Sequence, residues 1–374
     1  MTLLGRMTLF SPKMLMVCAL AVLTSCAPLP ELVGVDNPDV PVGSVEGATL
    51  KKVFITTTRQ ETEAVGAFFS AERAPDLGLA SVQVSIPPTH QTGNLERPKR
   101  LPPDPRTEFA IVDPMVYDND RAFINAVNAE LSKRPRNERN ILFFVHGYNN
   151  TTSDAVLRLA QFANDSGFKG VPVLFDWASA ASVTRYVYDL NSALVARPMV
   201  PEISRILNQT EAKGFDIFAH SMGSFLTMEA MKDAVMSGRF NSYGKLNSIM
   251  LASPDIDMDL FRSQLSQIDL KLDRFYVLFS DDDSALRVSR RLAGGVPRVG
   301  ASNIEELAAL GVVAIDLSEV EDSRSGSHSK FAGSPEVVQL IGNGLNKTNS
   351  IADGSQRRQL RDFVSGAPIT IAFD

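Results

Sequence analysis

The stretch Phe215-Asp216-Ile217-Phe218-Ala219-His220-Ser221-Met222-Gly223 decides the fold of this chain. Its first part, residues 215–218, is apolar apart from Asp216 and has the composition of a buried strand, and a helical segment follows from about residue 222 to residue 236. Small residues stand two positions before and two positions after Ser221, where a strand that turns sharply into a helix has no room for larger side chains. Such a turn would project the Ser221 hydroxyl above a sheet.

The same alternation of short strands and helices continues on both sides of this stretch. The wholly apolar strands indicate a mostly parallel sheet with helices on both faces, because only burial on both faces removes polar residues from a strand. We therefore predict an α/β fold. It should open with a hairpin or meander around residues 53–55 and 82–86, followed by an irregular proline-rich connection at 87–105. Further strands are expected at 141–145, 171–175, 215–218, 248–252, 275–279 and 312–315, and helices at 120–131, 153–162, 201–207 and 222–236.

Two loops of this pattern resemble the catalytic loops of an α/β hydrolase. Residues 219–223 resemble its nucleophile elbow, with Ala219 in place of the first glycine, and make Ser221 the candidate nucleophile. His146-Gly147 follows the strand at 141–145, where α/β hydrolases begin the loop that supplies an oxyanion donor. The backbone N–H groups of Tyr148 and Met222 are therefore the candidate oxyanion hole, and the start of the helix at 222 would add a positive dipole end.

The chain contains only four histidines, and their order in the sequence separates their roles. In α/β hydrolases the order is serine, acid, histidine. His328 alone lies downstream of Ser221, so it is the candidate general base, although a lone histidine in such a loop is ordinarily a solvated residue. We expect His220 to pack beneath the serine, His146 to support the oxyanion loop, and His90 to be a surface residue.

The acid should lie between Ser221 and His328, at the end of a strand. Asp283, in the triple-aspartate loop 281–283 after the strand at 275–279, is the first choice. Asp255, after the strand at 248–252, is the alternative. We expect the other aspartates of the triple to be solvated or to cap the following helix. The three are consecutive, unlike the alternating ligands of a calcium loop, so we predict no metal requirement and no cofactor.

Beyond these motifs, the chain resembles a bacterial family of esterase/lipase-like α/β hydrolases of uncharacterised function, over about Val53 to Ile341. In that family the acid precedes an Ala-Leu pair, as in Asp283-Ser284-Ala285-Leu286, and the resemblance implies ester hydrolysis without identifying a substrate. One departure lies at residues 175–179, where the family would have proline before Ser179. The supporting segments are Phe54-Ile55-Thr56-Thr57-Thr58-Arg59, Val84-Ser85-Ile86-Pro87, His146-Gly147-Tyr148-Asn149, Phe175-Asp176-Trp177, Tyr186-Val187-Tyr188-Asp189, Ala219-His220-Ser221-Met222-Gly223 and Ser253-Pro254-Asp255-Ile256-Asp257.

The N-terminus has the pattern of a lipoprotein signal. Arg6 and Lys13 precede an apolar run at 14–23 that is too short to span a bilayer, and Leu23-Thr24-Ser25-Cys26 resembles the bacterial lipobox. An ordinary signal peptide with a chance cysteine is the alternative. We predict a signal peptide at 1–25, lipidated Cys26, an extended tether at 26–49, the hydrolase domain at 50–345 and a C-terminal extension at 346–374. The mature protein would be lipid-anchored in the bacterial envelope, with its catalytic domain outside the cytoplasm.

Composition narrows the possible functions. The formal net charge is −6, and no basic stripe interleaved with aromatic residues is present, so the chain lacks the electrostatic footprint of a nucleic-acid binder. The leading hypothesis is a serine hydrolase of a small-molecule or lipid ester or thioester. A non-catalytic envelope lipoprotein that uses the fold for binding is the alternative, and amide hydrolysis is a third possibility. The sequence does not indicate an oligomeric state.

Overall fold

The computed structural model describes residues 29–268, 274–321, 326–346 and 368–372. Within these ranges ten strands form one sheet, in the order β10-β9-β8-β7-β6-β4-β5-β1-β2-β3. The strands are β1 (Thr49–Glu61), β2 (Phe69–Ile86), β3 (Ala110–Val116), β4 (Asn140–Val145), β5 (Val171–Asp176), β6 (Gly214–His220), β7 (Leu246–Ala252), β8 (Phe275–Phe279), β9 (Val313–Asp316) and β10 (Thr370–Ala372).

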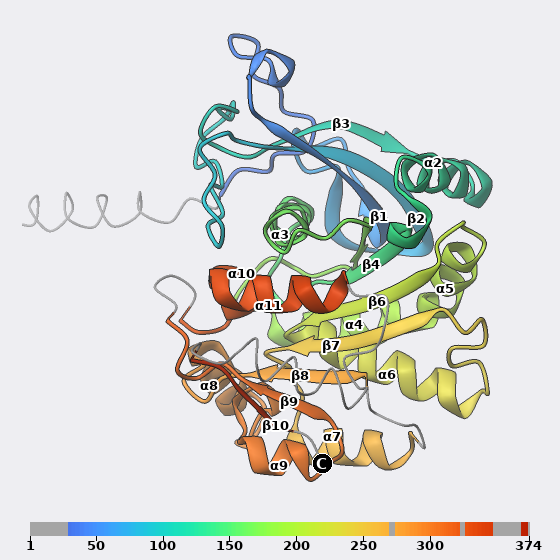
Figure 1. The fold of residues 1–374 in the computed structure, drawn as a ribbon, viewed down its shortest axis with the longest axis vertical. Coiled ribbons are helices and arrows are strands. Elements are labelled where there is room, and N and C mark those ends of the chain that lie inside the picture. The colour runs from blue at the N-terminus through green and yellow to red at the C-terminus, as the bar shows by residue number, and fades with distance from the viewer. Residues whose placement is uncertain (1–28, 269–273, 322–325, 347–367, 373–374) are drawn as a thin grey trace, which may run out of the picture.

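The sheet is mostly parallel, as the apolar strands predict. Strands β1, β5, β4, β6, β7, β8 and β9 pair in parallel, whereas β2 and β3 at one edge and β10 at the other are antiparallel. Figure 1 shows the blue N-terminal strands and the orange to red C-terminal strands at opposite ends of the molecule. This is the predicted α/β-hydrolase fold.

Helices cover both faces of this sheet. Buried side chains of α3, α10 and α11 pack on one face, and those of α2, α4, α5, α6, α7 and α9 pack on the other. The helices are α2 (Asp120–Ser132), α3 (Thr152–Asp165), α4 (Tyr186–Ala196), α5 (Val200–Asn208), α6 (Met222–Met236), α7 (Met258–Ser266), α8 (Ser284–Leu292), α9 (Ile304–Ala308), α10 (Lys330–Gly333) and α11 (Pro335–Leu345).

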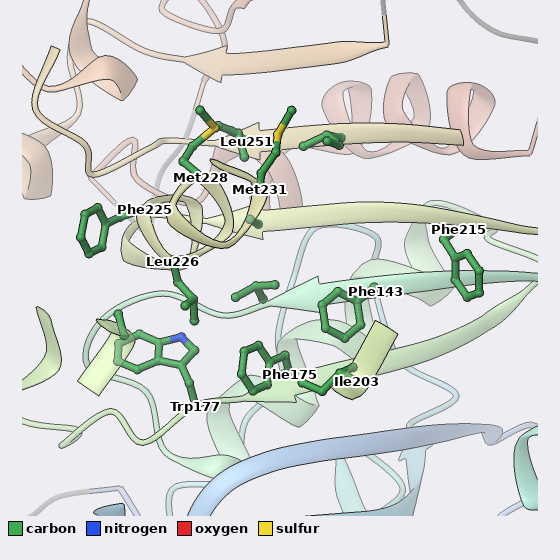
Figure 2. Close-up of a cluster of buried hydrophobic side chains, with 14 of the residues drawn as sticks. Phe143, Phe175, Trp177, Ile203, Phe215, Phe225, Leu226, Met228, Met231 and Leu251 are labelled. Carbon is green, nitrogen blue, oxygen red and sulfur yellow. The ribbon is translucent and has the colours of Figure 1, made fainter. Parts of the chain in front are cut away.

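Strand β4 illustrates why double burial gives a wholly apolar sequence. Ile141 and Phe143 belong to the core on one face, and Leu142 and Phe144 to the core on the other, because successive side chains of a strand point to opposite faces. Figure 2 shows part of the core that contains Ile141 and Phe143, with Phe143 close to Phe175. Every position of such a strand must therefore be apolar.

The order of the central strands creates a crevice for the site. Strand β4 lies between β5 and β6, so the chain reverses its direction of progress across the sheet at this point. The helix after β4 packs on one face and the helix after β6 on the other. Ligands of open α/β sheets bind at such switch points, beyond the carboxyl ends of the strands. The loops carrying His146 and Ser221 begin at these two strand ends.

Two terminal segments of the described chain pack on the domain. The described part of the expected tether, residues 29–49, is not free: Leu32 and Val33 are buried, and the N–H of Leu32 donates to Ser153 Oγ over 2.9 Å. These two buried apolar side chains dock the segment on the domain. At the other end, β10 adds an edge strand to β9, so part of the C-terminal extension belongs to the sheet. The predicted signal peptide at 1–25 and residues 347–367 of the C-terminal extension lie outside the described residues.

His90 corrects a second expectation, because it is not a surface residue. Its side chain is only 9% exposed, and its two ring nitrogens each lie 2.7 Å from a carboxylate oxygen, of Glu96 and of Asp165 in α3. Burial alone would lower the pKa of His90, but the two carboxylates outweigh burial and raise it to about 8. Protonated His90 therefore fastens the irregular connection at 87–105 to the domain.

This ion bridge predicts a pH-dependent stability. Because the pKa of His90 is raised on folding, its contribution is fully present below its unfolded-state pKa near 6.5 and is lost as pH rises through about 8. After allowance for solvent screening we expect about 1 kcal/mol. Urea unfolding should show His90→Gln less stable than the parent protein by this amount at about pH 6, with the gap closing by about pH 9. A gap that does not change with pH would contradict the assignment.

Candidate active site

Ser221 occupies the single residue between β6 and α6. Its backbone has φ 54° and ψ −122°, a conformation that costs a residue with a side chain on the order of 1–3 kcal/mol. Three backbone hydrogen bonds hold it there: the N–H of Ser221 donates to Ala252 O, and its carbonyl accepts from Ser224 and Asp255. The predicted elbow is therefore present, with Ala219 accommodated in the core.

Small residues around the elbow allow two loops to approach each other. A Cβ at Gly223 would lie 2.4 Å from His146 O and 2.5 Å from Val145 O. A Cβ at Gly147 would lie 2.9 Å from the Cβ of Ser221. All three distances are shorter than van der Waals contact between the atoms. Any larger residue at either glycine would therefore separate the loop after β4 from the serine.

The two predicted oxyanion donors lie at this contact. Met222 is the first residue of α6, and Tyr148 follows the glycine that touches Ser221. Among the described residues, neither backbone N–H has a hydrogen-bond acceptor. The Tyr148 side chain is fixed away from its own N–H, because its hydroxyl donates to Ser182 O over 3.1 Å and its ring packs on Tyr186. Two unsatisfied N–H groups beside a serine can bind a developing negative oxygen.

A buried polar network supports the loop from below. His146 stacks on Trp177 with ring centroids 5.0 Å apart, and the indole N–H of Trp177 donates to His146 O over 2.8 Å. The Nε2 atom of His146 lies 3.2 Å from Asp176, which also forms an ion pair with Arg59 at 2.7 Å. Burial would raise the pKa of Asp176, but Arg59 and His146 more than offset burial and lower it. His146 thus supports the oxyanion loop, as expected.

The structure pairs His328 with Asp283. His328 Nδ1 lies 2.8 Å from Asp283 Oδ2, and Asp283 is completely buried. The other carboxylate oxygen, Oδ1, accepts the N–H of Leu286 over 2.9 Å and caps α8. We expected a neighbouring aspartate to cap this helix, but Asp283 both caps α8 and pairs with His328. The cap fixes the carboxylate in the orientation that the imidazole needs.

Asp255, the alternative acid, is engaged elsewhere. Its carboxylate accepts hydrogen bonds from Tyr186 and Ser289 and lies 3.3 Å from Arg298 Nε. Burial and the negative charge of Asp255 raise the pKa of the Tyr186 hydroxyl, so Tyr186 remains a donor. The side chain of Asp255 therefore stabilises the loop after β7, and its backbone N–H supports Ser221.

His220 connects His328 to the elbow. Its Nε2–H donates to His328 O over 3.0 Å, and the two rings have centroids 4.7 Å apart. Burial and the neighbouring His328 hold the pKa of His220 well below its usual value, so it remains neutral. His328 thus lies against the residue that precedes Ser221. Among the described residues no hydrogen bond joins Ser221 Oγ to His328, a common situation in ligand-free sites, where catalytic contacts tighten on binding.

Lys330 fastens the loops that carry the acid and the histidine. Its side chain is 1% exposed, and its ammonium donates to Ser280 Oγ, Asp282 Oδ1, Leu317 O and Ser318 O over 2.9–3.1 Å. These acceptors come from the loops after β8 and β9. The sequence analysis missed this residue, although a lysine two positions after the candidate histidine was visible. It also gave no role to Arg59 or Asp176, which lie in segments of the family resemblance.

Comparison with protein families supports this description of the fold. The model of a family described as "alpha/beta hydrolase of unknown function (DUF900)" matches residues 120–344, more than half of the chain. The chain belongs to this family. The DUF900 match includes Ser221, Asp283 and His328 together with both candidate oxyanion donors. The chain has no match among curated proteins.

Solved structures similar to this DUF900 chain include hydrolases from three microorganisms. A predicted CIB-like hydrolase of Thermoplasma acidophilum has 13% identity and a TM-score of 0.35, over 80% of this chain and 99% of that one. An esterase of Pyrobaculum calidifontis has 12% identity and a TM-score of 0.36, over 81% and 86%. The phospholipase PlaB of Legionella pneumophila has 13% identity and a TM-score of 0.38, over 63% and 67%.

The burial of Lys330 leads to a stability prediction. Replacing it with Met removes the ion pair with Asp282 and the donor to the carbonyls of Leu317 and Ser318, so we expect Lys330→Met to lose about 3 kcal/mol of unfolding free energy. The matched control is Lys232→Met in α6. Its side chain is 20% exposed, and among the described residues its ammonium pairs with Glu229 alone, so we expect a loss below about 1 kcal/mol. Urea unfolding measures both. Equal losses in the two variants would show that Lys330 does not have the structural role described above.

Proposed function

We propose that this α/β hydrolase cleaves a carboxylic ester or thioester through an acyl-enzyme intermediate. Ser221 is the nucleophile, His328 the general base and Asp283 the acid that orients it. The observation that carries the proposal is the strained Ser221 backbone at the elbow, together with a His328–Asp283 pair whose imidazole packs on His220, the residue before Ser221. Strain of this kind persists in a protein only where the surrounding structure enforces it, and it is concentrated at functional sites.

The proton follows a defined route in this mechanism. His328 Nδ1–H donates to Asp283, which leaves Nε2 unprotonated and able to take the proton of the Ser221 hydroxyl as its oxygen attacks the carbonyl carbon. The imidazolium then returns the proton to the departing alcohol or thiol. In the second half-reaction His328 takes a proton from water, the hydroxide attacks the acyl-enzyme, and Ser221 recovers its hydroxyl. Asp283 stays ionised throughout and stabilises the charged imidazole.

The oxyanion that forms in each half-reaction would be bound by the N–H groups of Tyr148 and Met222. Both are free of acceptors among the described residues, and Met222 opens a helix of 15 residues whose dipole adds positive potential. Loss of one such donor typically costs about 100- to 1,000-fold in kcat. This assignment needs no metal ion or cofactor.

A binding-only role is the alternative, and the strained serine argues against it. A protein that used the fold only to bind a partner would gain nothing from a non-glycine residue with positive φ at the end of β6. Amide hydrolysis uses the same groups, and the preference for esters rests on the resemblance to esterase-like families.

Replacing Ser221 tests the proposal directly. Ser221→Ala should lower kcat/KM for a chromogenic ester by about four orders of magnitude or more, because no other group can form the acyl-enzyme. The matched control is Ser224→Ala: the Ser224 hydroxyl is buried in the same helix turn and donates to Ala219 O, and the substitution keeps the backbone N–H that donates to Ser221 O. It should keep activity within about threefold. Turnover by Ser221→Ala equal to that of the control would refute the assignment.

We also propose that the mature protein is anchored to a bacterial membrane through lipid on Cys26. This rests on the lipobox-like residues 23–26, which lie outside the described residues. Within the described ranges no helix has the length and apolar content to cross a bilayer. Multiple acyl chains on one residue give a durable anchor at roughly 0.8 kcal/mol per buried methylene.

Labelling in bacteria tests the anchor. Cells grown with radioactive palmitate should incorporate label into the parent protein and none into Cys26→Ser, which should also leave the membrane fraction. Palmitate on the variant, or no label on the parent, would contradict the proposal.

A further inference from the structure

A cavity of about 410 Å³ lies between the sheet and helices α5 and α6. We call it the α5–α6 cavity. Phe143 and Phe175 form its floor on the sheet, and Ile203, Leu226 and Met231 form its walls on the helices. Figure 2 shows these side chains, and it shows Phe215 at the end of the strands opposite to Leu226. The deep part of the lining, on the strands and the inner faces of the helices, is mainly apolar, and the polar and charged side chains gather near the amino ends of the strands.

This cavity is separate from the site at Ser221. Neither Ser221, Tyr148 nor His328 lines it. Its inner end is at Val145, the last residue of β4, and its outer end is at Phe215, near the start of β6. In the β4–β6 register Val145 is opposite Ala219, so the cavity follows about four residues of strand, or ~13 Å. It opens toward the amino ends of the strands, opposite the catalytic loops.

An apolar space of this size favours an apolar occupant, because filling it restores van der Waals contacts. Protein interiors are close-packed, and an apolar cavity does not hold ordered water, because water needs polar partners there. At roughly 30 Å³ per methylene, similar to the share of one water molecule in the liquid, the volume fits a chain of about a dozen carbons. The length of the cavity agrees with a medium-length aliphatic chain.

The mouth carries positive charge. Arg239 donates through Nε to Ser237, and Lys245 donates to the carbonyls of Asn208 and Thr210; neither forms an ion pair with a carboxylate of the described residues. Burial and the nearby Lys213 lower the pKa of Lys245, so an anion beside it would be favoured. Of the other charged lining residues, Arg205 pairs with Asp120 and Asp233 pairs with Arg197.

We propose that the α5–α6 cavity binds a free aliphatic carboxylate of medium chain length. The chain lies along Phe143, Phe175 and Leu226, and the carboxylate lies between Arg239 and Lys245. A mainly apolar channel, with two cations at its mouth that have no carboxylate partner among the described residues, matches an amphiphile with an anionic head in both shape and charge. This binding does not require the Ser221 chemistry and would occur in a protein that cannot hydrolyse esters.

Calorimetry with dodecanoate tests the proposal. The protein carries Ser221→Ala, so that hydrolysis plays no part, and we expect one dodecanoate per chain. Ala230→Phe, which fills the cavity from α6, should weaken binding at least about tenfold. Lys245→Gln and Arg239→Gln should each weaken it about fivefold, the effect of about 1 kcal/mol. The matched control Arg291→Gln removes an exposed arginine far from the cavity and should change nothing.

Three results would overturn the proposal. They are an absence of dodecanoate binding, binding that Ala230→Phe leaves intact, and equal affinity for the neutral methyl ester of the same acid. If Ala230→Phe does not fold, Ala234→Phe, at a partly exposed lining position, blocks the cavity with less overpacking and gives the same reading. Esterase activity in the Ser221-containing protein with Ala230→Phe should be unchanged, which separates this site from the proposed catalytic one.

Discussion

The positive φ of Ser221 is the constraint on which the rest of the site depends. The Ser221 backbone is held in this conformation by three hydrogen bonds: its N–H donates to β7, and its carbonyl accepts from Ser224 and Asp255. The elbow in turn requires glycine at 223 and 147, since any Cβ would collide with the facing loop. Backbone strain at one residue therefore determines which residues can stand at two others and how closely the loops after β4 and β6 approach.

The remaining parts of the site are held by groups that each serve two loops. Asp283 caps α8 with one oxygen and meets His328 with the other. Lys330 joins the loop after β8 to the loop after β9. Asp176 holds both Arg59 and the histidine beneath the oxyanion loop. Through such shared contacts, residues as far apart in sequence as Arg59 and Lys330, more than 250 positions, belong to one rigid framework at the strand ends. A rigid framework needs little reorganisation during a reaction.

The sequence predicts the features that depend on local pattern and chain order. Wholly apolar strands revealed a sheet buried on both faces, small residues revealed the elbow, and the unique downstream histidine led to the pair that the structure brings together. It could not predict contacts made through distant partners. His90 meets Asp165, which lies 75 positions away along the chain. Two of the four oxygens around Lys330 are backbone carbonyls, which leave no trace in a sequence. The docking of Leu32 and the edge strand β10 depend likewise on surfaces formed elsewhere.

The central claim is that Ser221 is chemically activated by its surroundings, and covalent labelling measures this most directly. The protein would be treated with a fluorophosphonate, digested and analysed by mass spectrometry. We predict a phosphonyl group on the peptide containing Ser221, attached to the Ser221 oxygen, and greatly slowed labelling when His328 is replaced by Ala. Labelling at another serine, or a Ser221 that reacts no faster than an ordinary surface serine, would contradict this account.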